Sequence, residues 1–482
     1  MRFGEILSEI SARASRYKFA LAIFLVSLAI RAIPEVLSGP YPVGFDTISF
    51  YVPNTIDWTS MGLSPLETLA ASPMMYFFTV PIYLLTKTNP ILIYKVAGPA
   101  LFGALMLATF RFCSIVLSWT EKTSFSATLL ASVYFVVLRV SWDAYRVELG
   151  LVFFLLGMSA KGGRHSIKME VLKSILFSAA ILSNELVALL VGASIIFDWL
   201  RAFGREAQTL RISQVVPFGV LGLTAFAILQ SPMGAGLSIV NGSPSPSTAF
   251  EASTFALYCY WLILPLALLG AQLARNAGIS FWLIACGLGI GASALPGSLL
   301  QSVGDRWVLL LAIPTLLMAF QGYGKLCASL SRRRGAAILR LSFLVVIVTL
   351  ATLYSLLPSQ AAFPYFAQFP NSMPSSLAQS SIPLSDGPYV VQSMKWLSKA
   401  LDGHSVLIAH LSFYGWARAY LDPRDNVINS LLSPPQDSLD KAAQFTHVFT
   451  VWWTPGNGWY GIHLSGYSPI MVYGDIAIYE LR

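Results

Sequence analysis

Charged residues are scarce in this sequence. Asp, Glu, Lys and Arg together make up 11% of its 482 residues, whereas a soluble domain is about a quarter charged. Hydrophobic residues make up 55%, and the mean hydropathy is +0.65. Apolar runs such as 338–357 are long enough to cross a hydrocarbon layer about 30 Å thick. This composition excludes a soluble enzyme and a disordered chain, and it indicates a polytopic membrane protein.

Cysteines and nucleotide-binding motifs are also lacking. The four cysteines lie in or beside apolar segments and residues 358–482 contain none, which excludes a disulfide-stapled secreted domain. No GxxxxGK[ST] or GxGxxG segment occurs, although such segments form the phosphate-binding loops of many nucleotide-dependent enzymes. Any group transfer must therefore use a substrate that arrives already activated, and a lipid-linked substrate suits a protein buried in a bilayer.

Positive charge is concentrated in short clusters between the apolar runs. Residues 1–357 carry 25 Lys and Arg against 15 Asp and Glu, while residues 358–482 carry 6 against 8. The net charge of +8 therefore reflects topology, with basic loops in the cytoplasm, and does not indicate a nucleic-acid partner. No small-residue cleavage site follows the first cluster, so the first helix is predicted to be uncleaved, with a cytoplasmic amino terminus. The basic clusters lie at 2–18, 161–168, 201–211 and 325–340.

This orientation predicts an α-helical membrane protein with about 11 transmembrane helices. A helix over 170–200 would be about 46 Å long, too long for one crossing, so this segment is predicted to form a hairpin with its outer turn at Asn184 and Glu185. The run 74–86 is left as a juxtamembrane or partly inserted helix. The other outward crossings are expected at 19–37, 123–140, 212–230, 279–295 and 338–357, and the inward ones at 91–111, 147–160, 254–273 and 306–323.

Three regions are expected on the outer side. The first loop, 38–73, carries three acidic residues and no basic one. A Ser, Pro and Gly-rich segment, 231–253, is typical of a flexible loop. After the membrane domain (1–357) and a linker (358–385), residues 386–482 are predicted to form a small extracytoplasmic α/β domain. Its expected helices are 387–401 and 437–444, and its expected strands are 405–409, 446–453 and 469–480.

Ionisable residues lie at four of the predicted outer helix ends. A charge at mid-bilayer depth costs on the order of 2.5–3.5 kcal/mol, so such residues usually pair or line a wet cavity. Carboxylates suit a general base that deprotonates an acceptor hydroxyl, and arginine forks suit a phosphate. Asp143 and Arg146 are three residues apart, which predicts that they share one helical face. We therefore expect one shared cavity at the outer face, formed by Asp46, Asp143, Arg146, Glu185, Asp305 and Arg306.

This layout resembles the GT-C superfamily of integral membrane glycosyltransferases, which includes protein O-mannosyltransferases, lipid A aminoarabinose transferases and the catalytic subunits of oligosaccharyltransferases. There an acidic residue follows the first span and precedes an aromatic residue, as Asp46 precedes Tyr51, and a second acid lies near a later outer helix end, as Asp143 does. The resemblance covers 1–357, and 358–482 is similar to the outer α/β domains appended to such enzymes. It implies that Asp46 is the catalytic base and that the donor is a polyprenyl-phosphate sugar, of the dolichyl type in archaea and eukaryotes.

Two motifs of the better-defined members are incomplete here. Protein O-mannosyltransferases carry Asp-Glu in the first loop, but Asp46 is followed by Thr47. Oligosaccharyltransferases carry a WWDYG motif, whereas this chain has WWTPG at 452–456, without the acid. A strand that ends in a Pro-Gly turn explains this segment equally well. Transfer to a peptide asparagine is therefore disfavoured, and the acceptor stays open.

The predicted function is an inverting glycosyltransferase that moves a sugar from a lipid-linked donor to a protein, lipid or glycan on the extracytoplasmic face. The expected partners are the donor, its acceptor and membrane lipids, and a divalent metal such as Mg or Mn is left open as a cofactor. A polytopic transporter or lipid-linked-sugar flippase is the alternative, although no internal repeat is visible; a non-catalytic scaffold is a third. The predicted catalytic residues are Asp46 and Asp143, and the predicted substrate-binding residues are Tyr51, Arg146, Glu185, Asp305 and Arg306.

Purely structural interpretations of these residues stay open beside the functional ones. Asp46 could be a solvated loop residue, and Asp143 with Arg146 could be an interfacial ion pair that only fixes helix depth. Glu185 could simply satisfy the hairpin turn. Arg31, deep in the first span, is expected to extend its side chain to the interface rather than bind phosphate.

Overall fold

The computed structural model describes residues 3–59, 62–160, 167–202, 211–230, 247–293, 304–330, 335–356, 382–422, 425–431, 433–455, 464 and 466–482. Most of the predicted loops 161–168, 201–211 and 231–253, the centre of 325–340 and most of the linker 358–385 lie outside these described residues.

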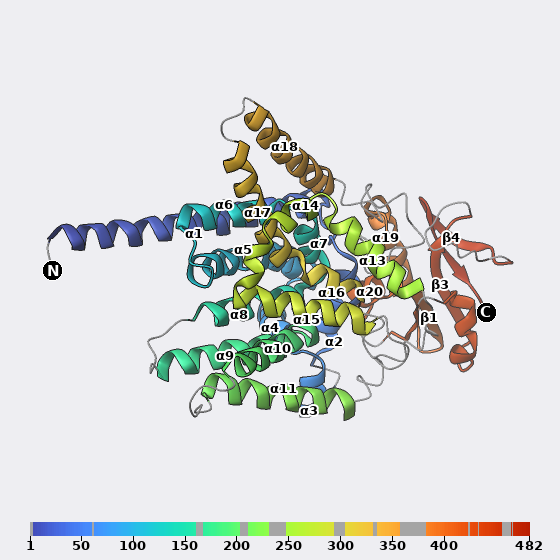
Figure 1. The fold of residues 1–482 in the computed structure, drawn as a ribbon. Helices are drawn as coiled ribbons and strands as arrows, with labels where there is room; N and C mark the ends of the chain where they lie inside the picture. The colour runs from blue at the N-terminus through green and yellow to red at the C-terminus, as the bar shows by residue number, and fades with distance from the viewer. Residues whose placement is uncertain are drawn as a thin grey trace.

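Helices form a bundle that makes up most of the described structure (Figure 1). Within the described residues, three helical segments are long and apolar enough to cross a membrane: Tyr17–Leu37, Pro90–Ile115 and Ile212–Gln230. The chain is accordingly an integral membrane protein with a polytopic helical fold, while the number of 11 crossings stays a prediction. The bundle helices are α1 (Phe3–Leu37), α5 (Pro90–Ile115), α6 (Glu121–Ser132), α7 (Phe135–Asp143), α8 (Tyr145–Ser159), α9 (Ile167–Ser183), α10 (Glu185–Ala202), α11 (Ile212–Gln230), α13 (Ser247–Tyr260), α14 (Leu264–Leu269), α15 (Ala277–Ser293), α16 (Gly304–Leu310), α17 (Ala312–Leu330) and α18 (Gly335–Leu356).

Three of the spans that the sequence predicts as single helices are broken. The segment predicted over 123–140 consists of α6 and α7, which are bent by 66°. The segment 254–273 is divided among α13, α14 and a 3₁₀ turn, η2 (Ala271–Arg275), and 306–323 is divided between α16 and α17. Apolar composition alone predicted continuous helices there, because it does not register the local breaks. The predicted hairpin is confirmed: α9 and α10 are joined by Asn184, whose Oδ1 accepts from the backbone N–H of Leu186 at 2.9 Å and so caps α10.

Arg31 of α1 does not extend to the interface, and the sequence-based expectation for it was wrong. Its side chain is fully buried and forms an ion pair with Glu35 at 2.9 Å. Its Nε donates to the carbonyl oxygen of Ser141 at 3.2 Å. Lys95 of α5 also contacts Glu35, at 3.1 Å, and donates to the carbonyl oxygen of Tyr41 at 2.7 Å. Glu35 therefore bridges two cations, and these contacts fix the end of α1, from which the first loop departs.

The first loop and the segment 74–86 that follows it contain four short helices. A π-helical turn, η1 (Thr47–Tyr51), continues into α2 (Val52–Asp57), and α3 (Pro65–Ala70) and α4 (Met74–Thr86) follow. At 1.5 Å per residue the 13 residues of α4 extend about 20 Å, which is shorter than a hydrocarbon layer of about 30 Å.

The C-terminal residues form a five-stranded mixed sheet with the order β2-β1-β3-β5-β4. β1 pairs in parallel with β2 and β3, and β5 pairs antiparallel with β3 and β4. The strands predicted over 405–409 and 446–453 are present, whereas the single strand predicted over 469–480 is a hairpin of two strands, β4 and β5. The helix predicted over 437–444 falls largely in a 3₁₀ helix, and α20 and β2 were missed. The elements are α19 (Gly387–Ala400) after a turn, η6 (Leu384–Asp386), then β1 (Ser405–His410), α20 (Leu411–Tyr420), β2 (Val427–Leu431), η7 (Pro435–Ala442), β3 (His447–Trp453), β4 (Pro469–Tyr473) and β5 (Ile476–Glu480).

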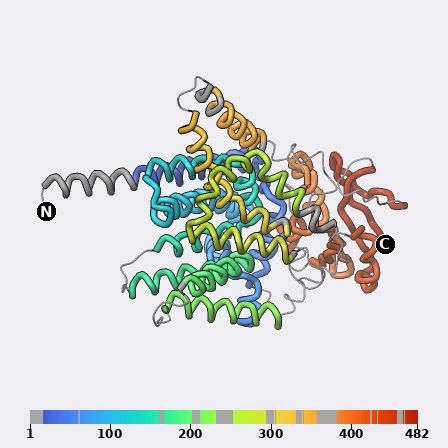
Figure 2. Tube along the Cα trace, in the orientation of Figure 1, coloured from blue at the N-terminus to red at the C-terminus, as the bar shows by residue number. Residues whose placement is uncertain are grey.

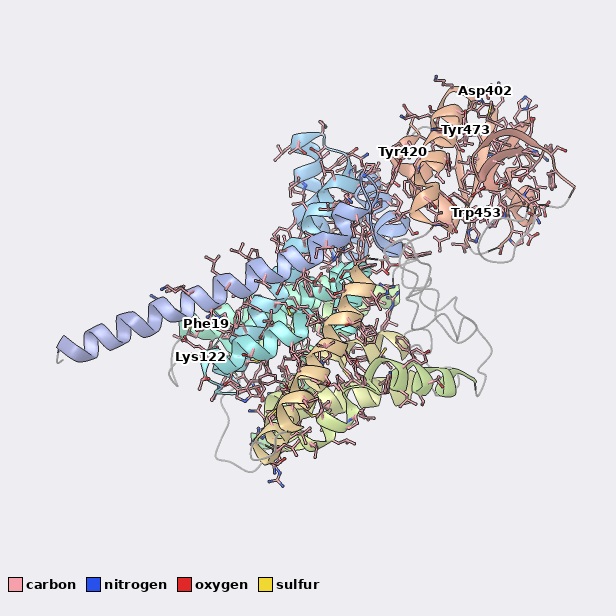
Figure 3. The ribbon with its side chains drawn as sticks, turned by 90° about the horizontal axis from the view of Figure 1, so that it is seen from above. Phe19, Lys122, Asp402, Tyr420, Trp453 and Tyr473 are labelled. Carbon is pink, nitrogen blue, oxygen red and sulfur yellow. The ribbon has the colours of Figure 1, made fainter. Side chains whose placement is uncertain are left out.

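The C-terminal domain shares an apolar core with the first loop. Ile48 and Tyr51 of η1 belong to the same buried cluster as Tyr145 of α8 and as Phe413 and Trp416 of α20. Figure 2 shows the blue first loop between the rest of the bundle and the red C-terminal domain, and Figure 3 shows Tyr420, at the end of α20, on the side of the domain that faces the bundle. The first loop therefore lies between two bodies that both pack against it.

Candidate active site

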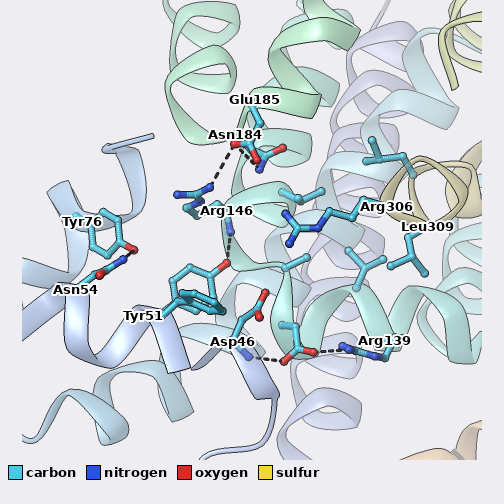
Figure 4. A pocket seen from close by; sticks show the side chains of 16 residues that line it. Asp46, Tyr51, Asn54, Tyr76, Arg139, Arg146, Asn184, Glu185, Arg306 and Leu309 are labelled. Atoms are coloured by element: carbon cyan, nitrogen blue, oxygen red, sulfur yellow. Dashed lines mark hydrogen bonds and ion pairs between the residues drawn. The ribbon is translucent and has the colours of Figure 1, made fainter. Parts of the chain in front are cut away.

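A cavity of about 270 Å³ lies where the first loop meets the ends of α7, α8, α10 and α16. Figure 4 shows the side chains that line it. Six residues that the sequence nominated from separate segments line this one cavity: Asp46, Tyr51, Asp143, Arg146, Glu185 and Arg306. The convergence that the sequence predicts is therefore present in the structure, while the role of each residue stays a prediction.

Asp46 is held at the cavity by its own backbone. It immediately precedes η1, and its N–H donates to Oδ1 of Asp143 at 3.2 Å. Two residues earlier, Gly44 adopts a φ of +100°, and a Cβ at this position would overlap the carbonyl oxygen of Trp142. Only glycine allows the loop to approach α7 this closely. The Asp46 side chain is half-buried and its carboxylate points into the cavity (Figure 4).

Asp143 forms its ion pair with Arg139, one turn earlier on α7, and not with Arg146. The side chains of Asp143 and Arg139 are 5% and 6% exposed. The sequence predicted one helical face for Asp143 and Arg146, and this was wrong because the helix breaks at Ala144, where φ is −92° and ψ is +47°. Arg139 was missed, although its i,i+4 spacing to an acid within an apolar run was visible in the sequence.

Arg146, at the start of α8, forms its ion pair across the cavity with Glu185 of α10. Its Nη2 lies 3.2 Å from Oε2 of Glu185, and its Nη1 donates to the carbonyl oxygen of Ala71 at 3.2 Å. The amide of Asn184 donates to the same Glu185 oxygen at 3.2 Å, so the cap of α10 also orients this carboxylate. Both side chains of the pair remain about a quarter exposed, so a ligand in the cavity can reach them.

Tyr51 presents a phenol to the cavity. Its oxygen accepts from the backbone N–H of Arg146 at 3.3 Å, which leaves the phenolic O–H as a donor. Burial raises the pKa of Tyr51 well above its usual value of 10, so the phenol stays protonated at physiological pH. Its ring contacts those of Tyr94 and Tyr145, at centroid distances of 5.6 and 5.2 Å. The position of the hydroxyl is therefore fixed by packing on both sides.

Arg306 enters the cavity from α16. Figure 4 shows its guanidinium pointing into the space between the first loop and α10, where it is close enough to Glu185 to interact electrostatically. The side chain of Asp305, also predicted as a site residue, lies outside the described part of the structure. The described lining thus carries three carboxylates and three guanidinium groups. Four of these six groups form two ion pairs, Asp143 with Arg139 and Glu185 with Arg146.

The lining of the cavity bears on the divalent cation that the sequence left open as a cofactor. Among them, no group of three or more His, Cys, Asp and Glu side chains gathers at one point. Of the two acids nearest each other in the cavity, Asp143 already accepts from Arg139 and from the backbone of Asp46. Mg²⁺ is commonly bound by one or two carboxylates together with water and substrate phosphates, so this lining leaves the divalent cofactor open.

The sequence matches no protein-family model and no curated protein. Among solved structures, the oligosaccharyltransferase of Archaeoglobus fulgidus in its apo form has a TM-score of 0.52 at 12% identity, over 90% of this chain and 69% of that chain. AglB from the same organism, in complex with an inhibitory peptide and a dolichol-phosphate, has a TM-score of 0.51 at 11% identity, over 89% and 69%. ArnT from Cupriavidus metallidurans, bound to undecaprenyl phosphate, has a TM-score of 0.49 at 13% identity, over 96% and 97%.

Identities this low establish a shared fold and nothing finer. The archaeal oligosaccharyltransferases are members of the GT-C superfamily. Trp452 and Trp453, which begin the WWTPG segment, are both 2% exposed in the core of the C-terminal domain, and Trp453 Nε1 donates to Asp386 at 2.9 Å. This chain therefore has the fold of the GT-C membrane glycosyltransferases, as the layout of its sequence predicts.

Proposed function

We propose that this protein is an inverting glycosyltransferase that transfers a sugar from a polyprenyl-phosphate-linked donor to an acceptor hydroxyl on the extracytoplasmic face of the membrane. One observation carries the proposal: an acid and an arginine from segments 260 residues apart, Asp46 and Arg306, point into a single cavity on a GT-C fold. The distribution of basic residues supports the orientation, with the amino terminus in the cytoplasm and the C-terminal domain outside.

In this proposal Asp46 is the general base. It accepts the proton of the acceptor hydroxyl as the acceptor oxygen attacks the anomeric carbon. The bond between that carbon and the phosphate oxygen breaks on the opposite face, and polyprenyl phosphate leaves with the electron pair. Arg306 and Arg146 stabilise the charge that develops on the phosphate, and the Tyr51 hydroxyl donates to it. Asp143 is the second acid, and it fixes the backbone of Asp46 through the 3.2 Å hydrogen bond.

An apolar cavity beside the charged one supports a lipid-linked donor. It measures about 490 Å³ and lies between α4 and α5. Met75 of α4 lines it, while the next residue, Tyr76, lines the charged cavity. A charged space next to a hydrocarbon-lined one suits a substrate that has a phosphate head and an apolar tail.

Sugar transfer by the full-length protein in lipid nanodiscs tests the proposal. The donor is a labelled polyprenyl-phosphate sugar, and the readout is released polyprenyl phosphate together with labelled acceptor. We expect Asp46→Asn to lower the transfer rate by about 10²–10⁴-fold, the usual contribution of a general base, without a change in melting temperature. A sugar phosphate that lacks the polyprenyl chain should be a far poorer donor.

Asp198→Asn is the matched control, because Asp198 is an exposed acid toward the other end of α10 from Glu185. The control variant should retain the wild-type rate. If the Asp46→Asn protein transferred sugar as fast as the control variant, Asp46 could not be the general base. Movement of the labelled lipid across a vesicle membrane without release of polyprenyl phosphate would instead support the flippase.

A further inference from the structure

The turn next to the proposed base has an unusual geometry. Residues Thr47–Tyr51 form a π-helical turn, which begins directly after Asp46 and ends at Tyr51. Such turns are rare and are frequent at functional sites, because they displace the backbone from the ordinary helical path. Asp46, the proposed base, and Tyr51, the residue proposed to donate a hydrogen bond to the phosphate, therefore lie at the two ends of one turn. Any shift of this turn moves both residues.

The membrane bundle holds one side of the turn. Asp143 accepts from the backbone of Asp46 at 3.2 Å, and the backbone of Arg146 donates to Tyr51 at 3.3 Å. Thr47 donates to the hydroxyl of Tyr145 at 3.4 Å. These contacts fix the turn relative to α7 and α8. They do not involve the opposite side of the turn, which packs against another element.

That opposite side is covered by α20 of the C-terminal domain. Gly415 is buried against the turn, and a Cβ at this position would overlap the carbonyl oxygen of Ile48. The helix therefore touches the backbone of the turn directly, without an intervening side chain. Trp416, which is fully buried, packs its ring against that of Tyr41 at a centroid distance of 5.7 Å.

An ion pair fixes α20 to the end of the same loop segment. Arg418 donates from Nε to Oδ2 of Asp57 at 3.2 Å, and its Nη2 contacts Oδ1 of the same carboxylate. Both side chains are about 15% exposed. A two-point contact between a guanidinium and a carboxylate fixes direction as well as distance. The contact therefore sets the register of α20 on η1 and α2, and with it the place of Gly415.

We propose that α20 is a positioning element for the sugar transfer, and that Gly415 and Arg418 are positioning residues that set the reach of Asp46 and Tyr51 into the cavity. The inference rests on the proposed function for its catalytic meaning. It assigns the C-terminal domain a part in the reaction although no described residue of that domain lines the cavity.

Steady-state kinetics and hydrogen exchange of the full-length protein test this inference. Arg418→Ala and Gly415→Ala should lower kcat by about 10–100-fold, because displacements near 1 Å carry penalties of this size. The KM for the donor should stay within about threefold of the wild-type value, because no described residue of α20 lines the charged cavity. Amides of residues 46–52 should exchange faster in both variants, and Arg418→Lys, which keeps the charge, should recover part of the rate.

His447→Ala is the matched control, since His447 is exposed and its Nδ1 forms a hydrogen bond with Glu480 at 2.8 Å in the same domain. It should change neither kcat nor the exchange of 46–52. The exchanged pair Asp57→Arg with Arg418→Asp should recover part of what each single variant loses, because it restores the contact between the two side chains.

The outcomes separate this inference from the proposed function. Unchanged exchange at 46–52 in Arg418→Ala and Gly415→Ala, or kcat values within twofold of the control, would overturn the positioning role. A wild-type protein that transfers no sugar would overturn the proposed function, and exchange at 46–52 would still decide whether α20 fixes the turn.

Discussion

Replacing Gly44 by alanine adds one methyl group at the point where the first loop meets α7. With φ at +100°, an L residue there is strained by about 1–2 kcal/mol. The new Cβ would overlap the carbonyl oxygen of Trp142 and lie 2.5 Å from Oδ1 of Asp143. Overpacking of this kind costs about another 1–3 kcal/mol, so we expect a total loss of about 2–5 kcal/mol in the free energy of unfolding.

The same substitution should also lower the rate of sugar transfer. The methyl group would lie too close to Oδ1 of Asp143, the atom that accepts the hydrogen bond from the backbone N–H of Asp46. The loop must therefore move away from α7. A displacement near 1 Å at the base corresponds to about a 10²-fold lower rate. The assay is sugar transfer in nanodiscs, below the melting temperature of the variant, with hydrogen exchange at 44–47 as a second readout.

Gly39 provides a control that separates backbone strain from collision. It also has a positive φ, +64°, but a Cβ there would meet nothing within 4 Å. Gly39→Ala should therefore cost only the strain, about 1–2 kcal/mol, and should transfer sugar at close to the wild-type rate. Equal transfer rates in Gly44→Ala and Gly39→Ala would refute the reasoning, because they would show that contact between the loop and Asp143 does not matter.

Two further predictions concern the guanidinium at the cavity and a carboxyl group in the C-terminal domain. Arg146→Lys keeps a charge but loses the fork that reaches both Glu185 and the Ala71 carbonyl; we expect the donor KM to rise by about tenfold, and an unchanged KM would contradict the proposed phosphate contact. Burial raises the pKa of Asp386 above 3.8, so its ionisation disfavours the folded state, and its contribution to stability falls as the pH rises from 3.8 through the raised value. Asp386→Asn, which can still accept from Trp453, should make the melting temperature less dependent on pH in that window, whereas an equal slope in both proteins would contradict the assigned shift.

The site was predictable from sequence because charge is costly in a membrane. Asp46, Glu185 and Arg306 stand out in an apolar chain, and the basic clusters place their segments at one end of the bundle. Neither the choice of these residues nor their placement at one end of the bundle requires knowledge of how the helices pack. The same reasoning located the turn between α9 and α10 at Asn184.

The pairing of the charges was not predictable, because it depends on where helices break. Ala144 interrupts the helix between α7 and α8, so Asp143 pairs with Arg139 and Arg146 is left for Glu185. A helical wheel drawn through 139–146 cannot anticipate this. The burial of Arg31 was missed for a related reason, since its partners Ser141 of α7 and Tyr145 of α8 are distant in sequence.

The role of α20 was hidden for a different reason. Its sequence, LSFYGWARAY, is short and contains a glycine, which lowers helix propensity. Tertiary contact overrides this low helix propensity, because only glycine fits where α20 touches the backbone of Ile48. The first turn of α20 is also capped by His410, whose Nδ1 accepts from the N–H of Ser412 at 3.2 Å. A residue that argues against a helix in the sequence is thus the residue that allows this helix to dock.

The ion pair between Asp57 and Arg418 joins residues 361 positions apart, and this has a consequence for biogenesis. At about 5–20 residues per second, a ribosome needs roughly 20–70 s after making Asp57 to deliver its partner. During that interval the bundle inserts while η1 lacks its cover. The proposed positioning of Asp46 and Tyr51 by α20 is therefore complete only after the C-terminal domain has been made and has folded onto the first loop.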